Sequence, residues 1–179
     1  MHDWNVVVTV REGGYNRSRK LLACFGEVER TDFYNILVMR MADPLILLEE
    51  LREESVRDPG GAADLARVMP VVRAFTFQTL QEFKVKARES VTPWLEVLAG
   101  KSFHLRMHRR GFKGKLSGME EEHFLDKYLL AGLENAGTPG RLAFTDPDAI
   151  IAMETIGPRA GLSLWSREEL ARFPLLHLD

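Results

Sequence analysis

The stretch KSFHLRMHRRGFKGKLS, residues 101–117, decides the fold of the second half of this chain. Its first half alternates between apolar and basic or imidazole side chains, as a half-buried β-strand does. The apolar side chains are those of Phe103, Leu105 and Met107, and the others are those of His104, Arg106, His108 and Arg110. The stretch holds no acidic residue, although the whole chain has a formal net charge of −2. Such a local excess of positive charge favours a polyanionic ligand.

A basic loop follows this strand, and a helix begins after the loop. Gly111 and Gly114 allow close approach of backbone N–H groups to a ligand, and basic side chains lie between and after them. Ser117 and Glu120 form a capping box, which predicts a helix that ends near Gly137. The N-terminus of that helix adds a further attraction for an anion.

Composition places the chain among ordinary globular proteins. It has 179 residues, of which 45% are hydrophobic and 28% charged, enough for one large domain or two small ones. The single cysteine, Cys24, excludes an internal disulfide and is predicted to be an inert core thiol rather than a reactive one. No signal peptide is recognisable, and no apolar run approaches the roughly 20 residues of a membrane span. We expect a cytoplasmic protein with no membrane partner.

The predicted elements of residues 1–76 follow the order strand, helix, strand, strand, helix, strand. This is the split βαβ, or ferredoxin-like, pattern, with its last strand over residues 67–75. Residues 77–179 follow a different order: helix, helix, strand, helix, strand, strand. Capping boxes at Thr79 and Ser117 open two of these helices. The fold class is therefore predicted to be α+β, with two domains at residues 1–76 and 77–179.

The second order resembles the THUMP domain, an RNA-binding module of tRNA-modifying enzymes. Residues 104–117 and 149–165 carry the resemblance, and residues 73–77 are similar to the chain that leads into THUMP. A ferredoxin-like domain commonly precedes THUMP, which the first segment fits. The chain resembles most the stand-alone THUMP proteins that assist tRNA cytidine N4-acetylation. The resemblance implies a non-catalytic adaptor that holds the acceptor end of tRNA, including its terminal CCA, while a separate acetyltransferase performs the reaction.

The predicted RNA-binding residues lie in and around the quoted stretch. Arg106 and Arg110 suit bidentate phosphate contacts, and the loop lysines add charge. Phe112 either stacks on a base or belongs to the core. Three acidic residues, 120–122, are expected to stabilise the helix dipole rather than face RNA. The full predicted set is His104, Arg106, His108, Arg109, Arg110, Gly111, Phe112, Lys113, Gly114, Lys115, Ser117 and Arg159. Arg17, Arg19 and Lys20 either extend this surface or form a plain solvated face.

The sequence contains none of the common catalytic motifs. The sequence has no dinucleotide fingerprint, phosphate-binding loop or nucleophile elbow, so we expect no catalytic residue and no cofactor. The spacing of His104, His108 and His123 matches no common zinc pattern, and nearby arginines would repel a cation, so no metal site is predicted. Two alternatives remain open. One is an enzyme or binding protein for a small phosphorylated ligand held at residues 111–117. The other is an assembly factor that pairs through a sheet edge.

Overall fold

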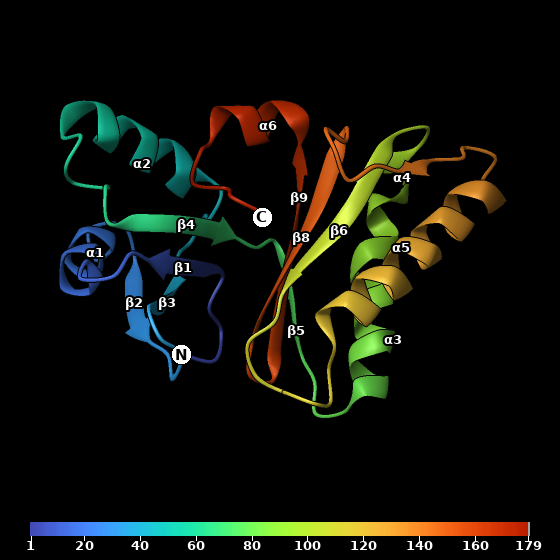
Figure 1. Ribbon diagram of the computed structural model, residues 1–179, viewed down its shortest axis with the longest axis horizontal. Helices are drawn as coiled ribbons and strands as arrows, with labels where there is room; N and C mark the ends of the chain where they lie inside the picture. The colour runs from blue at the N-terminus through green and yellow to red at the C-terminus, as the bar shows by residue number, and fades with distance from the viewer. Residues whose placement is uncertain (179) are drawn as a thin grey trace. The chain divides into compact units, whose positions relative to one another are not determined.

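The computed structural model describes residues 1–178, which form an α+β structure with two separate β-sheets (Figure 1). The chain divides into two compact units. The first comprises Met1–Val72 together with the chain from Leu170 onward, and the second comprises Arg73–Glu169. The predicted α+β class is confirmed, and the two units are described separately below.

The first unit contains one antiparallel four-stranded sheet and two helices. In chain order these are β1 (Val6–Val10), α1 (Tyr15–Leu22), β2 (Glu27–Arg30), β3 (Ile36–Arg40), α2 (Ile46–Arg57) and β4 (Leu65–Pro70). The strands lie in the order β2-β3-β1-β4. The elements therefore follow the predicted sequence of strand, helix, strand, strand, helix, strand.

The core of the first unit forms around β1, a valine-rich strand between β3 and β4. The helices contribute Leu22, Leu48 and Leu51, which are all buried. Cys24 is exposed, so its predicted place in the core is wrong. The reason is that α1 ends at Leu22, and Cys24 falls in the turn after it.

The second unit contains a five-stranded sheet with helices packed against it. Its elements are β5 (Arg73–Thr76), α3 (Leu80–Val91), the 3-10 helix η1 (Thr92–Trp94), α4 (Leu95–Leu98), β6 (Ser102–His108), α5 (Gly118–Asn135), β7 (Arg141–Leu142), β8 (Ala149–Ile156) and β9 (Arg159–Ser166). The strands lie in the order β5-β9-β8-β6-β7. β6 runs parallel to both of its neighbours, and β9 runs antiparallel to β8 and β5. Helix α6 (Arg167–Arg172) leads back to the first unit.

Residues 67–75 were predicted as one strand, but they form two. Proline has no N–H to donate to a sheet, and β4 ends at Pro70. The next strand, β5, pairs with β9 in the second sheet. At the other end of the chain, the carbonyl of Leu175 accepts from the backbone N–H of Val68, 2.9 Å away. The compact units therefore differ from the predicted domains at both ends of the second one.

The two faces of β6 differ as its alternating pattern predicts. Phe103, Leu105 and Met107 belong to the buried core that α3 and α5 complete. Their neighbours on β6, including Arg106, project from the opposite face. Burial of one face thus fixes which side chains of the strand remain available for other contacts.

One edge of β6 is closed by side chains of α5 rather than by a full strand. β7 pairs only with Ser102 and Phe103. Further along, the N–H of Leu105 donates to Asp126 Oδ1 at 3.0 Å, and that of Met107 donates to Glu122 Oε1 at 2.7 Å. The carboxylates of α5 therefore hold β6 in position.

Candidate nucleic-acid interface

The face of β6 opposite the helices carries the alternating polar residues of the quoted stretch. Arg106 is exposed and has no ion-pair partner among residues 1–178. His104 is buried, with its Nδ1 2.8 Å from the carbonyl oxygen of Ala143. His108 is half-buried, and its Nδ1 lies 3.7 Å from a carboxylate oxygen of Glu154. Of these three predicted RNA-binding side chains, Arg106 is therefore the one that faces solvent.

Arg110 was predicted to grip phosphate, but its guanidinium contacts a carboxylate of the protein. Its Nη1 lies 2.5 Å from Glu154 Oε2, and the Glu154 side chain is fully buried. The backbone N–H of Arg110 also donates to Thr155 Oγ1 at 2.9 Å. Glu154 and Thr155 are the two polar residues in an otherwise apolar β8, and nothing in the sequence shows that they face this arginine. Arg110 is thus engaged within the second unit.

The first two residues of the loop after β6 pack closely against other parts of the second unit. Gly111 has a φ of +98°, and a Cβ there would lie 2.9 Å from the Cα of Gly157 in the β8–β9 turn. Phe112 also has a positive φ, +51°, and its ring lies 4.9 Å from that of Phe77 in the core. Of the two alternatives for Phe112, its packing favours the core over base stacking.

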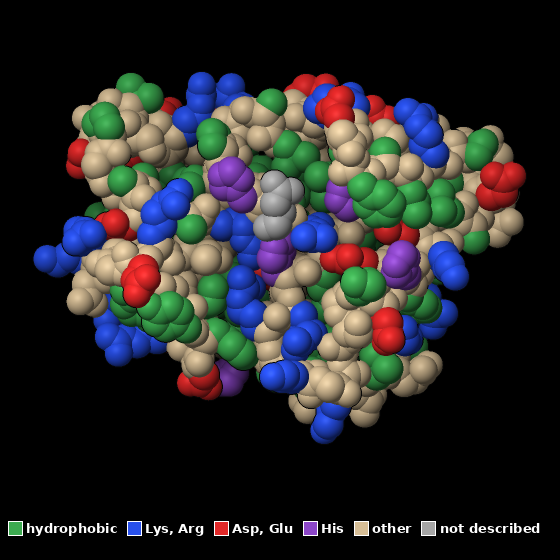
Figure 2. Space-filling model, in the orientation of Figure 1, with side chains coloured by type: hydrophobic (Ala, Val, Ile, Leu, Met, Phe, Trp, Pro, Cys, Tyr) green, Lys and Arg blue, Asp and Glu red, His purple; other side chains and the backbone are tan. Residues whose placement is uncertain are grey.

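The loop then presents its charge to solvent. Lys113, Gly114 and Lys115 are exposed, and neither lysine has an ion-pair partner among residues 1–178. A Cβ at Gly114 would meet no atom within 4 Å, so this glycine faces open space. Lys and Arg side chains lie over the lower end of the second unit, where the β6–α5 loop runs (Figures 1 and 2).

A polar hollow of about 410 Å³ lies between this loop and the start of α5. It is lined by Arg109, Gly114, Lys115, Leu116, Ser117, Gly118 and Glu120. Ser117 Oγ accepts from the backbone N–H of Glu120 at 3.4 Å, so the predicted N-cap is confirmed. The first backbone N–H groups of a helix have no hydrogen-bond acceptor within the helix, and those of α5 lie beside the two basic side chains that line the hollow.

The acidic residues at the start of α5 are largely turned away from the hollow. Glu121 is buried and pairs with Lys84 of α3 at 3.0 Å. Glu122 accepts from the backbone of β6, as described above. Glu120 alone among the three lines the hollow. The charge that would oppose a phosphate is therefore smaller than the sequence suggests.

The remaining predicted residues lie near this loop or in the first unit. Arg109 is half-buried and donates to the carbonyl of Gly111. Arg159, also half-buried, begins β9 and pairs in register with Thr76. In the first unit, Arg17 forms an ion pair with Asp64 at 2.6 Å, whereas the other two basic residues of α1 are exposed.

Asp126, which accepts a hydrogen bond from the backbone of β6, has an unusual protonation equilibrium. Burial raises its pKa from 3.8 to about 7, because a buried carboxylate loses its hydration. The N–H of Leu105 opposes this shift, and the nearby charge of Glu122 adds to it. Below neutral pH Asp126 is therefore mostly protonated and places no negative charge next to β6.

The described part of the chain, residues 1–178, lacks two further features. Within that range, no cluster of three or more His, Cys, Asp or Glu side chains is arranged to hold a metal ion. None of the helices in the same range has the length and apolar character needed to cross a membrane.

Comparison with known proteins shows a shared fold. No family model matches the chain, and no curated protein matches its sequence. Among solved structures, TrmN from Thermus thermophilus is 18% identical, with a TM-score of 0.61, over 90% of this chain and 45% of its own. PH1313 from Pyrococcus horikoshii is 13% identical, with a TM-score of 0.59, over 92% and 55%. A 4-thiouridine synthetase, crystallised with RNA and ATP, is 13% identical, with a TM-score of 0.54, over 92% and 42%.

The chain has a THUMP-like fold. This agrees with the resemblance of residues 104–117 and 149–165, and at these identities it is the fold alone that the likeness shows. The chain spans about half the length of the structures it matches.

Proposed function

We propose that this protein binds tRNA through the second unit, with the exposed cations of β6 and its loop as the main phosphate contacts. The observation that carries the proposal is the set Arg106, Lys113 and Lys115, three exposed cations without ion-pair partners among residues 1–178. They lie on one strand and the loop that follows it, beside a helix N-terminus. The shared fold with a synthetase crystallised with RNA supports an RNA partner.

The arrangement proposed for the chain is a ferredoxin-like unit followed by a THUMP domain. The strand order β2-β3-β1-β4 and the element order of the second unit support it. We further propose that the protein is a non-catalytic adaptor, which presents the acceptor end of tRNA to a separate acetyltransferase for cytidine N4-acetylation. The resemblance of the sequence to adaptors of that kind supports this finer assignment, as well as a cytoplasmic location.

Filter binding of labelled tRNA tests the proposal. We expect Lys113→Ala to weaken binding, whereas Lys127→Ala, which removes an exposed lysine further along α5, leaves it unchanged. Removal of the terminal CCA from the tRNA should weaken binding to the wild-type protein. Equal affinity of the two variants would contradict the assignment of the loop, and indifference to trimming would contradict the acceptor end as its target.

The hollow of about 410 Å³ at the start of α5 supports one alternative, a small phosphorylated ligand. Helix N-termini bind such anions through the same amides that would contact RNA. A competition experiment separates the two functions. If tRNA is the ligand, inorganic phosphate or a mononucleotide at millimolar concentration should displace little of it. Full displacement by either would favour the small ligand.

A further inference from the structure

The loop between β7 and β8 exposes an aromatic ring. Phe144 is 69% exposed. The residue before it is fixed on both sides: the N–H of Ala143 donates to the carbonyl of Phe103 at 3.1 Å, and its own carbonyl accepts from His104 Nδ1 at 2.8 Å. A carbonyl accepts only, so this contact also places a proton on Nδ1. The start of the loop is therefore tied to β6.

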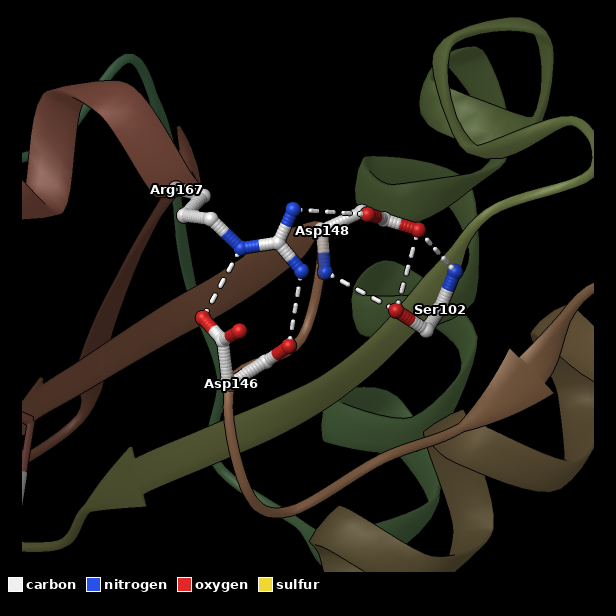
Figure 3. A network of polar contacts seen from close by, with 4 residues as sticks. All are labelled: Ser102, Asp146, Asp148 and Arg167. Carbon is white, nitrogen blue, oxygen red and sulfur yellow. Dashed lines mark hydrogen bonds and ion pairs between the residues drawn. The ribbon is translucent and has the colours of Figure 1, made fainter.

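The other side of the loop is held by a polar network around Arg167 (Figure 3). Arg167 Nε lies 2.8 Å from Asp146 Oδ1, and its Nη1 lies 3.1 Å from Asp148 Oδ1. Asp148 Oδ2 in turn accepts from the backbone N–H and the hydroxyl of Ser102, at 2.8 and 3.0 Å. The network joins the loop to the beginnings of β6 and α6. Phe144 is thus displayed on a braced loop, which lowers the entropy lost when a ligand binds it.

The surroundings of Phe144 indicate what it contacts. Its ring centroid lies 5.3 Å from that of His104, at an interplanar angle of 44°, so the two rings pack against each other in a tilted arrangement. Lys101 just before β6, Arg106 on β6 and Arg141 on β7 are exposed and have no ion-pair partner among residues 1–178. Exposed cations around the ring do not suit an apolar protein surface. Single-stranded nucleic acid fits both features, because its bases stack on aromatic side chains and its phosphates contact cations.

We propose that Phe144 stacks on an unpaired nucleobase of the bound RNA, whose backbone follows β6 to the basic loop. This inference rests on the proposed function and names its base-contacting residue. From His104 to His108, where β6 ends, the strand extends about 13 Å, and Arg106 projects from the same face between them. A single-stranded segment placed along β6 therefore contacts Phe144 at one end and the loop lysines at the other. In this proposal the residue that stacks on a base is Phe144, and not Phe112, for which the sequence left base stacking as one of two alternatives.

Substitutions at Phe144 separate stacking from simple burial. In filter binding of tRNA, Phe144→Ala and Phe144→Leu should weaken affinity about 5- to 100-fold, whereas Phe144→Trp should preserve or strengthen it. The slope of affinity against salt should stay unchanged, because the ring neutralises no phosphate. Tyr34→Ala is the matched control, since Tyr34 is 78% exposed in the first unit. Circular dichroism verifies that each variant is folded.

The F144W variant also provides a direct signal. The native tryptophans, Trp4, Trp94 and Trp165, are each at most 9% exposed, so an indole at position 144 dominates the quenchable emission. Its fluorescence should be quenched by tRNA and not by an equal charge of heparin. If Phe144→Ala binds tRNA as the wild type does while Lys113→Ala does not, stacking is overturned and RNA binding stands. If the wild-type protein does not bind tRNA, both proposals fall.

Discussion

Asp126→Asn is a substitution that we expect to stabilise the protein above neutral pH. The Asp126 side chain is 3% exposed and accepts the N–H of Leu105 at 3.0 Å. Asparagine retains a carbonyl oxygen for this hydrogen bond and cannot ionise. The substitution therefore removes the cost of a buried charge while it preserves the support of β6.

The magnitude follows from the pKa of Asp126, which rises from 3.8 to about 7 on folding. Between about pH 4 and pH 7 the folded state retains a proton that the unfolded state has lost, so stability falls as the pH rises through this window. At about 1.4 kcal/mol for each unit, the loss reaches about 4 kcal/mol when the group is fully ionised. Below pH 4 the carboxyl is neutral in both states and contributes no such penalty.

Urea denaturation, followed by far-ultraviolet circular dichroism from pH 4 to pH 8, measures this difference. The wild-type protein and the Asp126→Asn variant share every other titrating group, so the difference between their free energies of unfolding isolates Asp126. We expect similar stability at pH 4 and an advantage of up to about 4 kcal/mol for the variant at pH 8. Parallel curves across the whole range would refute the reasoning.

The other predictions concern the loop after β6. In thermal unfolding, Gly111→Ala should lower the Tm more than Gly114→Ala: both residues have positive φ, but only at position 111 would the new Cβ meet a neighbour, the Cα of Gly157 at 2.9 Å. Equal losses would show that this close approach is unimportant. Arg110→Met should cost about 3–5 kcal/mol, because it removes a partner of the buried Glu154. Adding Glu154→Gln should recover most of that cost in urea denaturation, and a double variant no more stable than the single one would contradict the pairing.

Local patterns predicted much of the fold. The alternation around Arg106 identified β6 and its two faces, and the Ser117 cap identified the start of α5. The α+β class and the element order of the first unit followed from the same kind of signal, whereas β5, which opens the second unit, was predicted as part of the preceding strand. Periodicity and capping report on neighbours in the sequence, which is why these features were accessible.

Contacts between distant segments were not accessible in this way. Nothing near Arg110 indicates that Glu154, 44 residues later, receives its guanidinium. The packing of Phe112 against the core depends on Phe77, and the exposure of Phe144 depends on a loop held by Arg167. The sequence therefore predicted where positive charge gathers, but not which cations remain available to a ligand.

The dependence of tRNA affinity on salt tests the central claim most directly. Each phosphate contact contributes about 0.7–0.9 to the slope of log K against log salt concentration. For a variant with Arg106, Lys113 and Lys115 all replaced by alanine, the slope should be about 2–3 shallower than that of the wild-type protein. An unchanged slope would mean that these cations do not contact the RNA backbone, and it would contradict the proposed interface.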